Sequence, residues 1–202
     1  MFNINTRDDF TIIFNTLNYK IGIELGSFQG QFANHILNSW NGKLICVDLF
    51  DRNDNPDLNK LNGFYSTFEK NLILPTFNQN LKNFTNRLLT IQSDTLNASQ
   101  FFPDNYFDFI YIDAEHSYQS VVNDITHWYP KLKSKGLIAG HDFLANFNYS
   151  LKNNEIYQPH NQSEYVGTFG VNTAVTDFTI QNNIKFYTTN EPYWKSWFWF
   201  KP

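Results

Sequence analysis

The chain has 202 residues, of which 42% are hydrophobic, so we expect a single α/β domain over residues 1–202 with a buried core. Its net charge of −4, with lysines and arginines scattered along the chain, argues against a broad phosphate-binding face and against nucleic acid as a partner. The single cysteine, Cys46, excludes an internal disulfide, and without a secretory signal or a long apolar run we expect a cytoplasmic protein that does not bind membranes.

Residues 1–19 contain one amphipathic helix. The segment from Thr6 to Asn18 has apolar residues near helical spacing, and Thr6 and Asp9 form the pattern of a capping box. We expect this helix to cover an edge of the sheet or a partner subunit, which would fit a homo-oligomer.

Residues 20–48 join two apolar strands through a glycine-containing turn and a helix. The first strand, IGIEL, carries Glu24, and the turn Gly26–Gly30 lets the backbone bend before a helix that begins at about Gln31. The second strand, LICV, leads to Asp48, roughly 20 residues beyond the turn, a spacing at which a carboxylate accepts hydrogen bonds from a ribose diol. The unit therefore predicts a nucleoside site.

The missing glycines indicate which kind of nucleoside is bound. A dinucleotide fingerprint needs G-x-G-x-x-G so that a pyrophosphate fits against bare backbone, and Phe28 and Gln31 occupy its second and third glycine positions. A phenylalanine would crowd a diphosphate but not S-adenosylmethionine, which has no phosphate. The segment resembles motif I of class I methyltransferases, in the E-x-G-x-x-x-G form of the O-methyltransferase branch. Taken alone, it also fits a unit whose glycines only make the turn.

Residues 51–86 give weaker signals. The polar stretch DRNDNPD, residues 51–57, predicts a mobile entrance loop, and residues 58–74 and 76–86 predict helical segments broken at Pro75.

Three more strands are predicted between Leu88 and Asp142, in LLTIQSD, FDFIYIDAEHSY and GLIAGHDF. Their apolar parts are short, as in strands buried on both faces. Each is followed by polar residues, just past the carboxyl end of the strand, where open α/β sheets bind ligands. These polar residues are Ser93, Asp94, Asp113, His116, His141 and Asp142. An apolar stripe from Val121 to Leu132 predicts a helix before the last strand, with Gly136 as its stop signal.

The elements D-x-x-H-S-Y and G-H-D-[FY] resemble those of class I methyltransferases of the macrocin-type and mycinamicin-type sugar O-methyltransferase family, with catechol O-methyltransferase more distant. The likeness runs from about residue 20 to the C-terminus, apart from residues 143–167. It implies that Asp48 contacts the ribose, that Asp94 lies near the adenine amino group, that Asp113 is a metal ligand and that His116 is a general base. Around the methionine part it implies Glu24, Gly26 and Gly30.

The candidate site residues fall into three sets. The catalytic set is His116 and Asp113. The metal set is Asp113, His141 and Asp142. The cofactor-binding set is Glu24, Gly26, Ser27, Gly30, Asp48, Ser93, Asp94 and Asp113.

These roles also suit the chemistry of methyl transfer. The acceptor oxygen must be aligned with the methyl group and lose its proton, and a Lewis acid would help a weakly acidic sugar hydroxyl. Two alternatives stay open: Asp113 could cap the following helix, and His116 could be a surface or capping residue. His141 leaves the need for a divalent metal, Mg or Mn, open, because imidazole suits zinc, iron or manganese better than magnesium.

The C-terminal third adds a loop and a hairpin. Residues 143–167 form a long aperiodic connection with the aromatic residues Phe143, Phe147, Tyr149, Tyr157 and Tyr165, which suits a lid over a glycan or small polyhydroxylated acceptor. A disordered or dimer-contacting loop is the alternative. IKFYTT and KSWFWFK predict an antiparallel hairpin. The expected fold is a Rossmann-like α/β sheet with strand order 3-2-1-4-5-7-6, strand 7 antiparallel and helices on both faces.

Two rival functions remain at this point. One is a nicotinamide- or nucleotide-sugar-dependent enzyme, which Phe28 and Gln31 disfavour. The other is a non-catalytic relative that binds S-adenosylmethionine, which the presence of both Asp113 and His116 disfavours.

Overall fold

The computed structural model describes residues 2–50, 72–144, 156–157, 167–168, 170–192 and 194–202. The predicted entrance loop 51–57, most of the predicted helical segment 58–74 and most of the predicted lid 143–167 lie outside the described residues.

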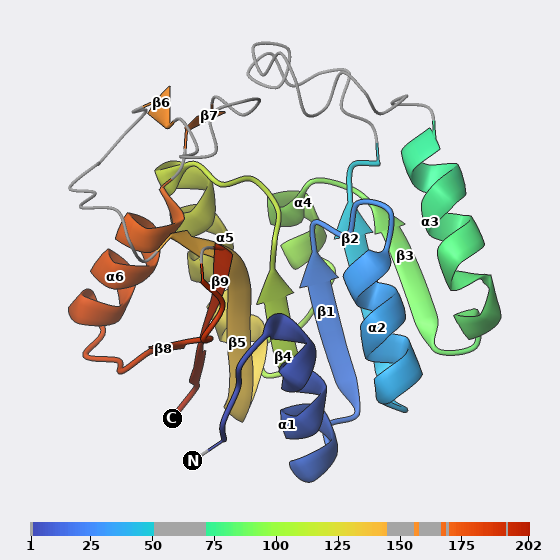
Figure 1. Cartoon of the computed structure of the whole chain (residues 1–202), viewed down its shortest axis with the longest axis horizontal. Coiled ribbons are helices and arrows are strands. Elements are labelled where there is room, and N and C mark those ends of the chain that lie inside the picture. The colour runs from blue at the N-terminus through green and yellow to red at the C-terminus, as the bar shows by residue number, and fades with distance from the viewer. Residues whose placement is uncertain (1, 51–71, 145–155, 158–166, 169, 193) are drawn as a thin grey trace.

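Seven strands form one sheet in the order β3-β2-β1-β4-β5-β9-β8 (Figure 1). The first five are parallel, whereas β9 runs antiparallel to both β5 and β8. Their bounds are β1 Ile21–Leu25, β2 Lys43–Asp48, β3 Leu88–Gln92, β4 Phe107–Ile112, β5 Leu132–Leu144, β8 Tyr187–Thr188 and β9 Trp194–Phe200. With β8 and β9 as the sixth and seventh strands, this confirms the predicted order and the reversed last strand. A separate antiparallel pair is formed by β6 Ile156–Tyr157 and β7 Gly167–Thr168.

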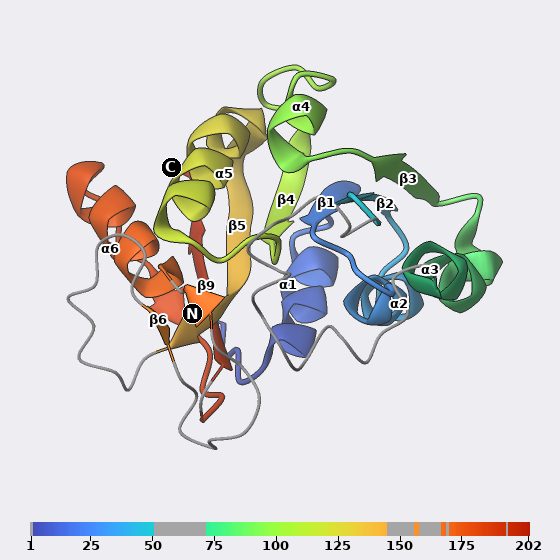
Figure 2. The same ribbon diagram turned by 90° about the horizontal axis from the view of Figure 1, so that it is seen from above.

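Helices cover both faces of the sheet, as Figure 2 shows from above. One face carries α1 Phe10–Thr16, α2 Gln31–Ser39 and α3 Ile73–Leu81. The other carries α4 Thr95–Ser99, α5 Tyr118–Trp128 and α6 Val171–Gln181. Each layer encloses its own cluster of buried apolar side chains, because the strands between them point alternate side chains to opposite faces. No described helix has the length and apolar character needed to cross a membrane.

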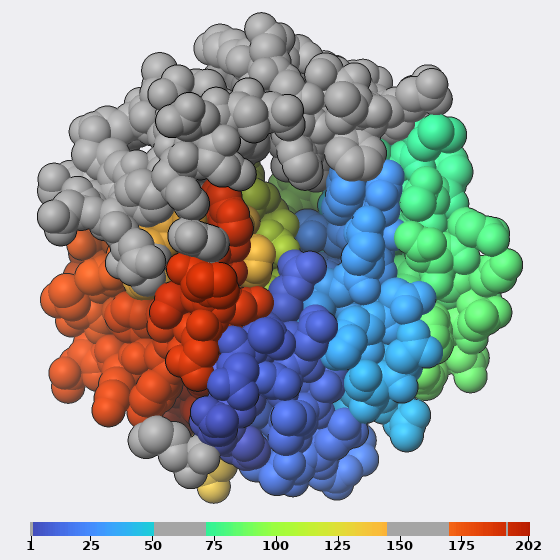
Figure 3. Space-filling view, viewed as in Figure 1, coloured from blue at the N-terminus to red at the C-terminus, as the bar shows by residue number. Residues whose placement is uncertain are grey.

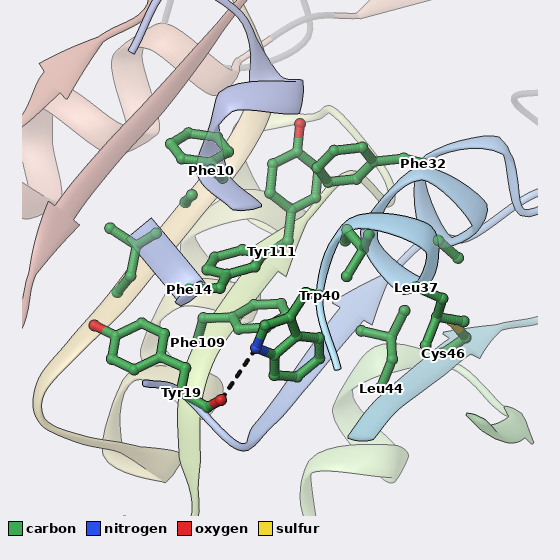
Figure 4. Packing of buried hydrophobic residues seen from close by; sticks show 14 of the residues in the cluster. Phe10, Phe14, Tyr19, Phe32, Leu37, Trp40, Leu44, Cys46, Phe109 and Tyr111 are labelled. Atoms are coloured by element: carbon green, nitrogen blue, oxygen red, sulfur yellow. Dashed lines mark hydrogen bonds between the residues drawn. The ribbon is translucent and has the colours of Figure 1, made fainter. Parts of the chain in front are cut away.

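The N-terminal helix covers the middle of the sheet. Its capping box is confirmed, since the Asp9 carboxylate accepts a hydrogen bond from the Thr6 amide at 3.1 Å. Phe14 stacks on Phe109 of β4, with ring centroids 3.8 Å apart, and Phe10 lies edge-on to Tyr111 (Figure 4). The prediction that this helix covers a sheet edge or a partner subunit is therefore wrong: its apolar stripe is buried within its own chain, where each such phenylalanine contributes about 1.5–3 kcal/mol.

The two ends of the chain lie side by side. Asn5 accepts a hydrogen bond from the amide of Asn190, which lies between β8 and β9, at 3.0 Å. Figure 3 shows the N-terminal segment against the C-terminal segment on this face.

Three local predictions need correction. Strand β3 lies at the edge of the sheet and is only half-buried, with Leu89 53% exposed, so it is not buried on both faces. Pro75 does not break a helix, because it lies in the first turn of α3, where its missing N–H has no helical acceptor to lose. Leu132 opens β5 instead of extending the helix before it, because α5 ends at Trp128 and a short 3-10 helix containing Pro130 follows.

Strand β5 also runs further than predicted. Gly140 pairs with Trp197 and Phe143 with Lys195, so β5 carries one extra residue between these pairs, which is a β-bulge. Asp142 adopts φ 59° within this bulge. His141 and Asp142 therefore lie inside a bulged strand and not beyond the end of a regular one.

Candidate active site

The turn after β1 is as tight as its glycines predict. Gly26 and Gly30 have φ of 84° and 79°, and Gly30 directly precedes α2, which begins at Gln31 as predicted. A Cβ atom at Gly26 would lie 2.0 Å from the carbonyl oxygen of Asp113. Only glycine fits there, so the turn after β1 is in direct contact with the loop after β4.

Glu24 is a buried carboxyl beneath this turn. Its Oε2 lies 3.5 Å from the Sγ of Cys46 on β2. Burial, and secondarily the charge of Asp113, raise the pKa of Glu24 to about 7. Ser27 Oγ is buried nearby and makes no well-formed hydrogen bond within the described part of the chain. The site thus holds an acidic group and a hydroxyl, both with capacity for a polar ligand.

Asp48 at the end of β2 is held by main-chain amides. Its Oδ2 accepts a hydrogen bond from the amide of Phe28 and its Oδ1 from the amide of Phe50, both at 2.7 Å. Each carboxylate oxygen has a second lone pair, which could accept a ribose hydroxyl. The carboxylate therefore fixes the turn Gly26–Gly30 and keeps lone pairs that suit a diol.

Asp94 and Ser93 follow β3 at the same edge of the sheet. Asp94 is the N-cap of α4: its Oδ1 accepts a hydrogen bond from the amide of Asn97 at 2.8 Å. Ser93 Oγ donates to the carbonyl of Asp94 at 3.0 Å. A contact of Asp94 with adenine stays a prediction.

The ends of β4 and β5 bring four of the predicted residues together. His116 Nε2 lies 2.7 Å from Asp142 Oδ2 and 3.6 Å from Asp113 Oδ1. His141 Nδ1 lies 3.1 Å from Asp142 Oδ1. The candidate catalytic pair and the candidate metal ligands therefore form one cluster, although they come from two strands.

The sequence left open whether Asp113 caps the following helix and whether His116 is a surface or capping residue. The loop between β4 and α5 answers both questions. The helix begins at Tyr118, and its N-cap is Ser117, whose hydroxyl accepts a hydrogen bond from the amide of Ser120. Asp113 is therefore not the helix cap. His116 is not a surface residue either, since only 21% of its side chain is exposed.

Opposite charges in this cluster shift the pKa values of one another's groups. Burial alone would lower the pKa of His116, but Asp142 and Asp113 raise it well above its usual range. Burial would raise the pKa of Asp142, but His116 and His141 lower it. Asp142 and Asp113 therefore favour a positive charge on the His116 imidazole, which is the charge that the ring gains when it takes up a proton.

Three ligand atoms of Asp113, His141 and Asp142 lie within 4.8 Å of one another, which is close enough for one metal ion. Two carboxylates and one imidazole suit manganese, iron or zinc better than magnesium, which prefers oxygen ligands. The predicted metal set is thus brought together by the fold.

Arg7 is a site residue that the sequence did not reveal. It comes from a short 3-10 helix, Arg7–Asp9, and its Nη1 lies 3.5 Å from Asp113 Oδ2. Its guanidinium lies over the ring of Phe32, 5.1 Å from the centroid. Since 106 residues separate Arg7 from Asp113, no local spacing could have indicated the contact.

Comparison with known proteins agrees with this geometry. Residues 23–143 match the family model of a methyltransferase domain. No curated protein matches the chain in sequence at a significant level.

Solved structures share the fold at low sequence identity. A proposed caffeoyl-CoA O-methyltransferase from Staphylococcus aureus superposes with a TM-score of 0.65 at 16% identity, over 96% of this chain and 82% of that one. An O-methyltransferase from Bacillus cereus, solved with S-adenosylhomocysteine, gives 0.62 at 13% identity, over 96% and 80% of the two chains. A 1,6-didemethyltoxoflavin N1-methyltransferase from Burkholderia thailandensis gives a TM-score of 0.55 at 12% identity, over 96% of this chain and 77% of that one.

The sequence left open a methyltransferase and a nicotinamide- or nucleotide-sugar-dependent enzyme. The family match and the sheet order are those of methyltransferases, so they favour the first of these two classes. The chain therefore belongs to the methyltransferase domain family, and it has the class I methyltransferase fold.

Proposed function

We propose that this protein transfers a methyl group to a hydroxyl oxygen of a sugar, a glycan or another small polyhydroxylated molecule. The observation that carries the proposal is the buried His116–Asp142 pair, 2.7 Å apart, beside Asp113, whose main-chain carbonyl lies against the turn Gly26–Gly30. A weakly acidic hydroxyl needs such a base next to the methyl donor.

The cofactor residues fit S-adenosylmethionine in charge and in position. Glu24 offers a carboxylate for an ammonium group, Ser27 Oγ is a buried hydroxyl with hydrogen-bonding capacity to spare, and Asp48 offers lone pairs to a ribose diol. When bound, S-adenosylmethionine supplies a methyl group activated by its sulfonium. The glycine turn keeps the methionine part next to the loop that carries His116.

In this proposal, His116 takes the proton of the acceptor hydroxyl. Asp142 orients the imidazole through Nε2, and Asp113 lies on the same side at 3.6 Å. These two carboxylates stabilise the positive charge that the imidazole gains when it accepts a proton.

Asp113, His141 and Asp142 would hold a divalent cation. A cation there would act as a Lewis acid on the acceptor hydroxyl. In the described part of the chain, Arg7 and His116 balance the negative charges of Asp113 and Asp142, so a cation would compete with them for these carboxylates.

The acceptor class rests on the composition of residues 143–167, most of which lie outside the described residues. Aromatic side chains among asparagines, glutamines and serines suit the stacking and hydrogen bonding of a sugar. Phe143 does not belong to this surface, because it is buried against Phe186, with ring centroids 5.5 Å apart.

The test is an acceptor screen that measures S-adenosylhomocysteine release. Sugars, nucleotide sugars and glycosides form one panel, catechols a second, and amines a third, each with EDTA, Mg²⁺ or Mn²⁺. Turnover confined to the hydroxylated panels supports the proposal. Turnover only with amines, or binding of S-adenosylmethionine without turnover on any panel, contradicts it.

A further inference from the structure

The N-terminal segment places one cation at the boundary between the cofactor turn and the catalytic cluster. Arg7 Nη1 lies 3.5 Å from Asp113 Oδ2, at the end of β4. The guanidinium lies over Phe32 in the first turn of α2, and it is close enough to Tyr111 and Glu24 to be influenced by their charges. Arg7 thus faces the carboxyl ends of β1 and β4 together.

Arg7 is held in this position by packing on both sides. The capping box of Thr6 and Asp9 fixes the 3-10 helix that carries it. The next helix anchors the chain through Phe10, which is fully buried and packs edge-on against Tyr111 at 6.0 Å. Figure 4 shows Phe32 beside Tyr111, with the phenol oxygen on the side away from Phe14. The guanidinium is therefore preorganised, which lowers the entropic cost of binding a ligand there.

The contacts of Arg7 leave it suited to a further anion. A guanidinium has five N–H donors in a planar fork that matches a carboxylate. The distance from Arg7 Nη1 to Asp113 Oδ2, 3.5 Å, is long for a charged pair, and 33% of the Arg7 side chain is exposed. A carboxylate ligand could make the short, two-point contact that Asp113 does not make.

The charges around Arg7 match those of an amino acid. An α-amino acid group carries an ammonium and a carboxylate on neighbouring atoms, and the methionine part of S-adenosylmethionine is such a group. Arg7 contacts Asp113 at the end of β4 and lies over Phe32, directly after the glycine turn, and Glu24 lies beneath that turn. We propose that Arg7 binds the carboxylate of the methionine part, so that the N-terminal segment completes the cofactor site; this rests on the proposed use of S-adenosylmethionine.

An acidic acceptor would be the other anion for Arg7 to bind. The position of Arg7 favours the cofactor, because Glu24 and Phe32 come directly before and after the turn Gly26–Gly30. Titrations with cofactors that carry or lack the carboxylate separate the two ligands.

Isothermal titration with three ligands tests the proposal. S-adenosylmethionine and S-adenosylhomocysteine carry the carboxylate, whereas decarboxylated S-adenosylmethionine keeps the ammonium and the sulfonium but lacks it. Arg7→Ala should weaken the first two by about 10- to 100-fold, the loss expected for a charged hydrogen-bonded pair, and the third by less than about twofold. Arg7→Lys should restore part of the affinity, because it keeps the charge but not the fork.

Lys43→Ala is the matched control. It removes the same charge at the amino end of β2, at the opposite end of the strands from the candidate site, and should change none of the three affinities. Melting temperatures of all variants show whether the fold is kept.

Three outcomes would overturn the proposal. Equal losses for S-adenosylmethionine and its decarboxylated form would mean that Arg7 acts through Asp113 or the fold. Unchanged cofactor affinity with a raised KM for an acidic acceptor would assign Arg7 to the acceptor. If the wild-type chain binds none of the three ligands, the proposed function fails as well, which distinguishes that result from the other two.

Discussion

At the end of β2 the candidate cofactor-binding carboxylate is engaged by main-chain amides, whereas at the ends of β4 and β5 the candidate catalytic carboxylates are engaged by basic side chains. Asp48 accepts hydrogen bonds from the amides of Phe28 and Phe50. Asp142 and Asp113 face His116, His141 and Arg7.

The two kinds of contact suit two different functions, cofactor recognition and catalysis. Main-chain amides hold a carboxylate in a fixed orientation at any pH near neutral, which suits the recognition of a ribose. Cationic side chains, in contrast, can exchange protons or make way for a metal ion, which suits catalysis. Substitutions in the β1–β2 half should therefore change cofactor affinity, and substitutions in the β4–β5 half should change turnover.

The largest effect is expected at His116. His116→Ala should lower kcat by roughly 10²–10⁴-fold, because the acceptor proton loses its base, with S-adenosylhomocysteine affinity within about twofold of wild type. Steady-state kinetics and titration measure the two quantities. His127→Ala is the control, since His127 is an exposed histidine on α5. Parallel losses of kcat and affinity would show that the β4–β5 half also binds the cofactor.

Removing a metal ligand should give the next largest effect. Asp113→Asn should weaken Mn²⁺ binding by at least about tenfold, because a neutral amide replaces one of two carboxylates in the set. Titration of the metal followed by the Mn²⁺ electron paramagnetic resonance signal measures this without an acceptor. His35→Ala, at a partly exposed histidine on α2 outside the metal set, should leave the affinity unchanged. A wild-type chain that binds no Mn²⁺, Zn²⁺ or Fe²⁺ would remove the metal from the β4–β5 half.

Asp48 tests the β1–β2 half. Asp48→Ala should weaken S-adenosylmethionine binding by at least about tenfold, since a charged acceptor for the ribose is lost, while kcat at saturating cofactor stays near wild type. The variant also leaves the amides of Phe28 and Phe50 without this acceptor, so a melting curve must accompany the titration. Unchanged affinity in a folded variant would remove Asp48 from the cofactor site.

The smallest effect is expected at Asp124, which lies outside both halves of the candidate site and affects stability. It is buried on α5, its partner is the Thr95 hydroxyl at 2.5 Å, and burial raises its pKa from 3.8 to about 7. The folded chain thus holds this proton more tightly than the unfolded chain does, so stability is greatest below the unfolded pKa and falls as the pH rises toward about 7.

Asp124→Asn should remove the share of this dependence that Asp124 contributes, leaving that of Glu24, and raise stability at pH 8 by about 1 kcal/mol, or roughly 2–4 °C in Tm. Thermal unfolding at several pH values between 5 and 8 measures it. Asp104→Asn, at an exposed position paired with Lys131, should behave like wild type. A lower Tm for Asp124→Asn at pH 8 would mean that the buried carboxylate is stabilised in its charged form.

The same contrast explains how much the sequence could predict. The β1–β2 half is local, and its turn, helix start and acidic strand end followed from glycine spacing and strand pattern. In the β4–β5 half the residues were predicted, but their geometry was not. Ser117, and not Asp113, caps α5, and Arg7 arrives from the other end of the sequence.

The strands could be predicted from their apolar runs and the sheet order from the resemblance to class I methyltransferases, whereas the burial of each face of a strand depends on whether that strand lies at an edge. β3 has the composition of an inner strand and yet lies at the edge. In the same way, the N-terminal helix showed its apolar stripe and its cap, but not which surface it covers. Long-range packing decides both, and one sequence contains no local signal for it.

The bulge in β5 has a consequence for which amino acids position 142 accepts. Neighbouring residues of a regular strand point to opposite faces, so His141 and Asp142 could not both reach one metal site without the extra residue. The bulge sets φ of residue 142 at 59°, which aspartate and asparagine tolerate better than other residues with side chains, and β-branched residues hardly at all. Position 142 thus has two requirements: a negatively charged side chain and a backbone that tolerates a positive φ. Asparagine there would separate the two requirements, since it retains the strand geometry and gives up only the charge.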